Sequence, residues 1–174
     1  MENNSLFEAW LEREDSYYEE KFFEPLVDAL CQYNGGTTDG RLAKGRIFNA
    51  GYEVFIYAFF LGLYMGERRP LAGPTRKFRM AMSSWGRKSN EKDRKSYTIL
   101  QKYIFIALVT KTDVYFLALD KGELNVNDVC KKLMATLNEY ANTGFYRMYD
   151  QLKKDPDYFF GNTSLLDMIR LVVS

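Results

Sequence analysis

The sequence predicts an all-α fold, a compact single-domain bundle of six or seven helices with a long basic loop. Over most of the 174 residues, apolar side chains recur at intervals of three and four, the spacing of one helix face. Pairs of strand-like segments joined by turn signals are nearly absent. Hydrophobic residues make up 47% of the chain and aromatic residues 16%, enough for a substantial core. A chain of this length is expected to form one domain over 1–174 without a disulfide or metal.

Two helices are expected in the acidic N-terminal part, 1–40. Ser5 and Glu8 have the spacing of a capping box, which predicts a helix from there to about Tyr18. A second helix is predicted over 22–32, where proline at position 25 fits because it falls in the first turn.

The third predicted helix, over 46–65, is the most apolar. Hydrophobic residues cover nearly all of its sides, which is typical of a central, buried helix. Gly51 and Gly62 lie inside it and disfavour helix formation, so they predict close approach of a neighbouring element. Gly66 is the expected C-cap, and Pro70 prevents the helix from restarting.

A long loop is expected over 67–95, with a helical turn near 76–82. It is too long for an ordinary connection, and such loops are usually functional. Further helices are predicted over 96–111, over 127–153, and from about residue 163 to the end of the chain. Between the first two, a short helix over 113–119 is predicted with Asp113 as its cap; a strand is the alternative, because Val114–Leu117 contains β-forming residues.

The composition excludes several kinds of chemistry. The chain has no histidine, which rules out a Ser-His-Asp triad, a Cys-His pair and an imidazole metal site. Two cysteines cannot build a structural zinc site, so we expect no metal and no cofactor. Cys31 and Cys130 are expected to be buried free thiols, a long-range disulfide being the alternative. The polar, acidic start does not resemble a signal peptide, and no apolar stretch is long enough to cross a membrane, so a cytoplasmic protein is expected.

Charge is distributed unevenly along the chain. Residues 1–40 carry two basic and ten acidic side chains, for a net charge of −8. Residues 41–66 carry a net +2, residues 67–95 carry ten basic and three acidic side chains for a net +7, and residues 96–174 are neutral. Such asymmetry concerns binding partners rather than fold.

The basic segment 67–95 is the main candidate site, because arginine forks bind phosphate oxygens bidentately. Phe78 and Trp85 lie among these cations and are predicted to stack on the bases of a single-stranded nucleic acid. The predicted nucleic-acid-binding residues are Arg68, Arg69, Arg76, Lys77, Arg79, Trp85, Arg87 and Lys88. Three alternatives remain open: the cations pair with the acidic arm within the chain or across a dimer, the first two arginines serve the end of the third helix, or the loop is simply solvated.

Two further polar positions lie in otherwise apolar helices. Glu53 is expected to form a structural ion pair with an arginine rather than to act in catalysis. Asn142, followed by Thr143 and Gly144, interrupts a long helix; close packing against the third helix is the favoured reason and a polar contact of Asn142 the alternative. The run 41–46 is weakly similar to a phosphate-binding loop but lacks the full pattern.

Several segments together resemble a known family. They are Gly51-Tyr52-Glu53 leading to Ala58–Leu63, Arg68-Arg69-Pro70-Leu71, Ile106-Ala107-Leu108 before Lys111-Thr112-Asp113, and Glu139-Tyr140-Ala141-Asn142-Thr143-Gly144. Their order and spacing resemble the Dnd system-associated protein 4 group, small helical proteins encoded beside DNA phosphorothioation systems. The resemblance covers about 46–152 and implies a bacterial DNA-modification or defence context, with no catalytic residues to transfer.

Three functional hypotheses follow. The first is a non-catalytic accessory protein that contacts DNA or a DNA-modifying protein through the basic segment. The second is a protein–protein module or homodimer in which the acidic arm of one copy binds the basic loop of another. The third is a small hydrolase that uses the carboxylates of Glu53 or Asp113.

Overall fold

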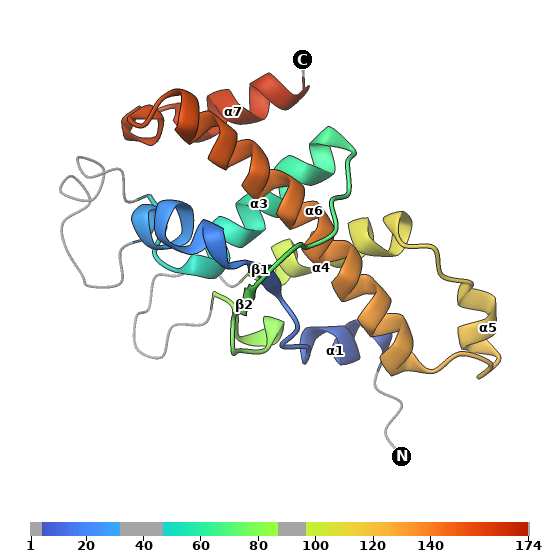
Figure 1. The fold of residues 1–174 in the computed structure, drawn as a ribbon. Coiled ribbons are helices and arrows are strands. Elements are labelled where there is room, and N and C mark those ends of the chain that lie inside the picture. Colours follow the sequence, from blue (N-terminus) through green and yellow to red (C-terminus); the bar gives the residue numbers. More distant parts are fainter. Residues whose placement is uncertain (1–4, 32–46, 87–96, 174) are drawn as a thin grey trace. The chain divides into compact units, whose positions relative to one another are not determined.

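The computed structural model describes residues 5–31, 47–86 and 97–173, and they are mostly helical (Figure 1). A small sheet of two strands, β1 (Tyr17–Glu19) and β2 (Thr75–Lys77), accompanies the helices, so the prediction of a purely α-helical fold is wrong in this respect. The contacts divide the chain into two compact units. Unit 1 comprises Met1–Ser16 and Lys77–Leu137, and unit 2 comprises Tyr17–Arg76 and Asn138–Ser174.

Helix α1 of unit 1, Leu6–Leu11, starts at the predicted capping box. The Ser5 hydroxyl accepts a hydrogen bond from the Glu8 amide, and the Glu8 carboxylate accepts one from the Ser5 amide, at 3.3 and 2.8 Å. The prediction that this helix reaches Tyr18 is wrong, because the chain leaves the helix after Leu11.

Unit 1 continues with the 3₁₀-helix η3, Met82–Ser84, and with α4, Thr98–Lys111, α5, Phe116–Asp120, and the first part of α6, Val126–Lys154. The α4 residue Gln101 is buried on the core side, where its amide donates to the Met82 carbonyl at 2.7 Å. Helix α5 has no side-chain cap, so the prediction that Asp113 caps it is wrong. The largest fully buried side chains of this unit include Trp10, Met82, Trp85, Ile104, Leu108 and Leu133.

Unit 2 begins with β1, Tyr17–Glu19, followed by the 3₁₀-helix η1, Glu20–Phe22, and the π-helix η2, Phe23–Asp28. Of these two short helices, η2 falls within the range predicted for the second helix, 22–32, and η1 precedes η2. Strand β1 pairs with β2, Thr75–Lys77, and the Glu20 amide donates to the Pro74 carbonyl at 2.9 Å beside the pair. The sequence predicts a helix near β1 and a loop at β2, because each strand has only three residues.

The remaining elements of unit 2 are α3, Gly51–Met65, the second part of α6, the 3₁₀-helix η4, Tyr158–Phe160, and α7, Ser164–Val173. Gly66 caps α3 in the left-handed conformation with φ of 69°, as predicted. The largest fully buried side chains here include Phe22, Leu26, Phe55, Phe59, Leu61 and Phe145.

Helices α3 and α6 approach closely at two glycines. A Cβ atom on Gly144 would lie 1.8 Å from the carbonyl oxygen of Ala58, and one on Gly62 would lie 1.9 Å from that of Tyr140. No rotamer change relieves a clash with backbone atoms. The predicted close packing at these helix-weakening residues is therefore confirmed.

Cys31 and Cys130 are both buried thiols rather than a disulfide, as predicted. None of the helices in the described ranges combines the length and the apolar character that crossing a bilayer requires.

Substituting Gly144→Ala is expected to lower the free energy of unfolding by roughly 2–4 kcal/mol, because the new methyl group forces the two helix backbones apart. Gly161→Ala is the matched control, since its Cβ would lie no closer than 3.4 Å to another atom. Urea denaturation followed by circular dichroism measures both. Equal stability of the two variants would contradict the close approach.

Candidate nucleic-acid interface

A buried carboxylate lies at the centre of the candidate site. Glu19, the last residue of β1, is 1% exposed. One of its oxygens, Oε1, accepts hydrogen bonds from the Ala72 amide at 3.1 Å and from the Asn142 side-chain amide at 2.9 Å. The other, Oε2, accepts from the Tyr146 hydroxyl at 3.1 Å and lies 2.6 Å from the Lys21 ammonium. Both oxygens therefore have two partners, as a buried carboxylate requires.

These partners determine the protonation state of Glu19. Burial on its own raises the pKa of the carboxyl group, but the donors from Lys21, Asn142, the Ala72 amide and Tyr146 together outweigh burial and lower the pKa below its ordinary value. Glu19 is thus a charged, fully hydrogen-bonded anchor and not a proton donor at neutral pH.

Asn142 connects this carboxylate to the chain that follows α3. Besides Glu19, its Nδ2 lies 3.2 Å from the Arg69 carbonyl oxygen and 3.1 Å from the Pro70 carbonyl oxygen. Three acceptors around one nitrogen fix the orientation of the amide group. Its Oδ1 is buried and has no donor within the described part of the chain. The polar contact predicted as an alternative for Asn142 is real, and it coexists with the packing of its neighbour Gly144.

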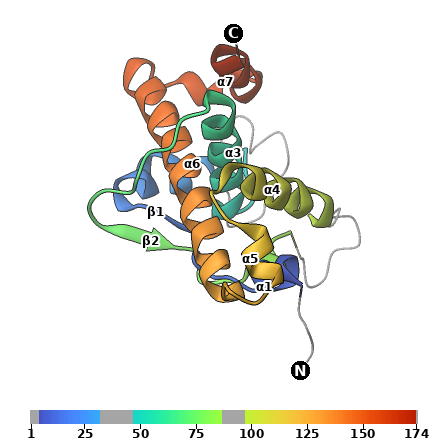
Figure 2. The same cartoon turned by 90° about the vertical axis from the view of Figure 1, so that its right-hand side faces the viewer.

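Residues 66–76, which we call the basic strap, run from the end of α3 beside α6 to β2 (Figures 1 and 2). The Arg69 amide donates to the Glu139 carbonyl at 3.3 Å, and Nε and Nη2 of Arg68 both lie 2.7 Å from Oε2 of Glu139. The segments Arg68–Leu71 and Glu139–Gly144 are therefore in direct contact.

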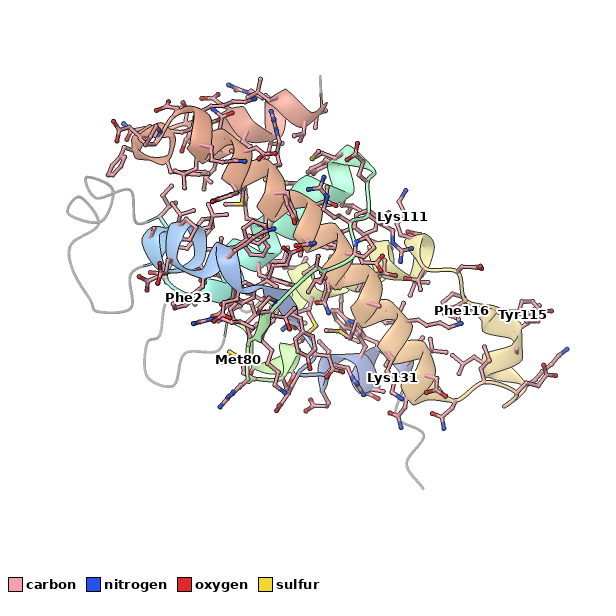
Figure 3. All side chains as sticks on the ribbon, viewed as in Figure 1. Phe23, Met80, Lys111, Tyr115, Phe116 and Lys131 are labelled. Atoms are coloured by element: carbon pink, nitrogen blue, oxygen red, sulfur yellow. The ribbon has the colours of Figure 1, made fainter. Side chains whose placement is uncertain are left out.

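At the far end of the strap, Arg76 is held by the acidic N-terminal arm. Its Nε and Nη2 lie 3.1 Å from a carboxylate oxygen of Glu20. Its guanidinium carbon also lies 3.9 Å from the centroid of the Phe23 ring (labelled in Figure 3). The pairing of the basic segment with the acidic arm, predicted as an alternative, thus occurs here within one chain.

Arg69 differs from its two arginine neighbours in the strap. Its guanidinium carbon lies 3.9 Å from the centroid of the Tyr146 ring, and it forms no ion pair with a described residue. Arg69 is exposed, so its charge faces solvent while the ring contact holds the side chain. Lys21 lies 4.0 Å from the same ring centroid.

Two more predicted cations follow the strap in the sequence. Lys77 and Arg79 are exposed, and neither forms an ion pair with any residue that the structure describes. Arg87 and Lys88 lie outside the described residues, as does the run 41–46.

The prediction that Trp85 stacks on bases is wrong for this conformation, because its side chain is 1% exposed in the core of unit 1. Phe78 packs edge-to-face against it, with ring centroids 6.1 Å apart. In a sequence, an aromatic residue within a basic loop is equally consistent with stacking on bases and with anchoring the loop to the core. In this structure Trp85 anchors the loop.

Glu53 has a local structural contact. Its carboxylate accepts a hydrogen bond from the Asn49 amide at 2.8 Å, just before α3 begins. Within the described ranges, no three cysteine or acidic side chains gather as a metal site would require.

Sequence reasoning missed Glu19 and Tyr146, the two residues at the centre of the cluster. The available signal was an acidic residue within a run of aromatic residues, Tyr17-Tyr18 before it and Phe22-Phe23 after it. Such a run indicates burial, and a buried acid indicates partners, but nothing local identifies them.

Substituting Glu19→Gln is expected to lower the free energy of unfolding at pH 7 by roughly 1–3 kcal/mol, because charge-assisted hydrogen bonds are lost. The lowered pKa of Glu19 means that its contribution is present above the ordinary pKa and disappears as the pH falls below about 4.5. The loss of stability on acidification should therefore be smaller in the variant.

Glu20→Gln is the control for that measurement, since Glu20 is half-exposed and its ion pair with Arg76 is expected to contribute under about 1 kcal/mol. Chemical denaturation between pH 3 and 7 gives both comparisons. A Glu19→Gln variant that matches the wild type at every pH would contradict the anchoring role.

Comparison of the chain with known proteins found no matching family model, no matching curated protein and no matching solved structure.

Proposed function

We propose that the protein is a non-catalytic binding protein that contacts the phosphates of a nucleic acid through the cations of its basic segment. The observation that carries this proposal is the anchored strap. Glu19 and Asn142 bind its backbone at Ala72, Arg69 and Pro70, so the exposed Arg69 is presented from a fixed position. Fixing the position of a cation before binding lowers the entropic cost of contacting an anion.

The uncompensated charges set the mode of binding. Arg68 and Arg76 have carboxylate partners, whereas Arg69, Lys77 and Arg79 are exposed without an ion pair to a described residue. Trp85 is buried and the half-buried Phe78 packs edge-to-face against it, which disfavours stacking of these rings on bases. Binding should therefore depend on phosphate contacts, with little sequence preference and a strong dependence on salt.

We further propose a biological setting from the resemblance described above. An accessory protein of a bacterial DNA-modification or defence system, working in the cytoplasm, would meet either DNA or a DNA-modifying protein that is already bound to DNA. Phosphate contacts of modest affinity suit such a role, because the partner supplies the specificity.

The hydrolase hypothesis has less support. Glu53 accepts a hydrogen bond from the Asn49 amide just before α3, which is a local structural contact. The hypothesis of a dimer formed by the acidic arm and the basic loop also has less support at Arg76, because the carboxylate that pairs with Arg76 is Glu20 of the same chain.

The double substitution Lys77→Glu with Arg79→Glu is expected to weaken binding to a 20-base-pair duplex at least tenfold at 50 mM salt. It should also reduce the slope of log affinity against log salt by about 2, since each lost phosphate contact changes it by about 0.9. Fluorescence anisotropy with labelled DNA at 50, 100 and 200 mM salt measures both quantities.

The matched control is Lys131→Glu with Lys153→Glu, which makes the same change in net charge at exposed lysines of α6. Two results would contradict the proposal: no binding by the wild type at micromolar concentration and 50 mM salt, or an equal loss in both double variants.

A further inference from the structure

Two cations of unit 2 share one aromatic ring. Nζ of Lys21 lies 4.0 Å from the centroid of the Tyr146 ring, and the guanidinium carbon of Arg69 lies 3.9 Å from it. The ammonium and the guanidinium therefore lie within about 8 Å of each other, whichever faces of the ring they occupy. The ring thus brings a cation of the acidic N-terminal arm close to a cation of the basic strap.

The two cations differ in how many of their hydrogen-bond donors are already used. The Lys21 ammonium lies 2.6 Å from the Glu19 carboxylate and donates to the Tyr146 hydroxyl, so one of its three N–H groups remains. The Arg69 guanidinium has neither a hydrogen-bond acceptor nor an ion-pair partner among the residues that the structure describes. Its five N–H groups are therefore available to a ligand.

The charge of this cluster matches one particular phosphate group. Glu19 and Lys21 form an ion pair and neutralise each other, which leaves the single positive charge of Arg69. A phosphodiester of a nucleic-acid backbone carries one negative charge. A terminal phosphomonoester carries about 1.5 to 2 at neutral pH, more than the cluster compensates.

We propose that Arg69 and Lys21 together bind one phosphodiester group of the nucleic-acid backbone, and that Tyr146 positions both cations. This inference rests on the proposed function and assigns one of its phosphate contacts to a defined place on the protein. Charge-assisted hydrogen bonds of about 2.8 Å on each side of a phosphate group span a separation of the size found between these two cations. The sequence gave no reason to include Lys21, because it lies in the segment 1–40 with a net charge of −8.

Binding of the full chain to a labelled 20-base-pair duplex at 50, 100 and 200 mM salt tests the role of Arg69. Arg69→Gln is expected to weaken binding roughly fivefold and to lower the slope of log affinity against log salt by about 0.9, the value for one phosphate contact. Arg170→Gln makes the same change in net charge at an exposed arginine of α7 and should leave both quantities unchanged. An equal effect of the two variants overturns this inference while the proposed function stands. A wild type that does not bind overturns both.

The role of the Tyr146 ring is separated from that of its hydroxyl by two variants. Tyr146→Phe and Tyr146→Leu both remove the hydroxyl that donates to Glu19, but only phenylalanine retains a ring. Tyr146→Phe should bind the duplex like the wild type, and Tyr146→Leu should be weakened as much as Arg69→Gln. Equal binding by the two variants would contradict the positioning role. If Tyr146→Leu does not fold by circular dichroism, Lys21→Gln decides the question, and its binding the duplex like the wild type overturns the inference.

Phosphodiesters also occur in phospholipid headgroups, so the ligand is compared with two other sources of phosphate. The same duplex is measured with 5′-hydroxyl and with 5′-phosphate ends, and vesicles of phosphatidylglycerol are measured at the same salt concentrations. We expect equal affinity for the two duplexes and weaker binding to the vesicles. A clear preference for the 5′-phosphate ends would indicate a monoester site and overturn the inference, as would tighter binding to the vesicles than to the duplex.

Discussion

The buried carboxylate of Glu19 is the constraint on which the rest of unit 2 depends. Glu19 ends β1, and its partners come from the basic strap at Ala72 and from α6 at Asn142 and Tyr146. One charged group thus connects three segments that are far apart in the sequence. Because an unpaired buried carboxylate is costly, displacing any one of the three segments would leave part of this charge uncompensated. The position of the strap, and with it the exposure of Arg69, follows from that requirement.

The separation of charge along the chain acquires a physical meaning from these contacts. The whole chain carries a net +1, which hides −8 in 1–40 and +7 in 67–95. Some of these opposite charges neutralise each other within the protein, where Glu20 pairs with Arg76. The cations that remain exposed without such a partner are the ones that support phosphate binding. Counting charge by segment therefore overestimates the charge available to a ligand, and the ion pairs correct the count.

Features determined by neighbours in sequence were predictable, and features determined by distant neighbours were not. The capping box of α1, the Gly66 cap of α3 and the extent of α6 follow from local spacing, and each is close to its predicted place. The β1–β2 pair and the anchoring of the strap require partners about 55 to 125 residues away, for which the sequence holds no local signal. The sequence predicts base stacking for Trp85 because composition alone does not distinguish a buried ring from an exposed one.

The central claim is that Glu19 holds the strap, and amide hydrogen exchange at Ala72 tests it most directly. This amide belongs to an exposed residue outside any helix or strand, yet it donates to a buried carboxylate. We predict that it exchanges at least 100-fold more slowly than in an unstructured peptide at pH 7, and that Asn142→Ala removes most of the protection by loosening the cluster. Exchange of the wild-type Ala72 amide at the unstructured rate would contradict the account.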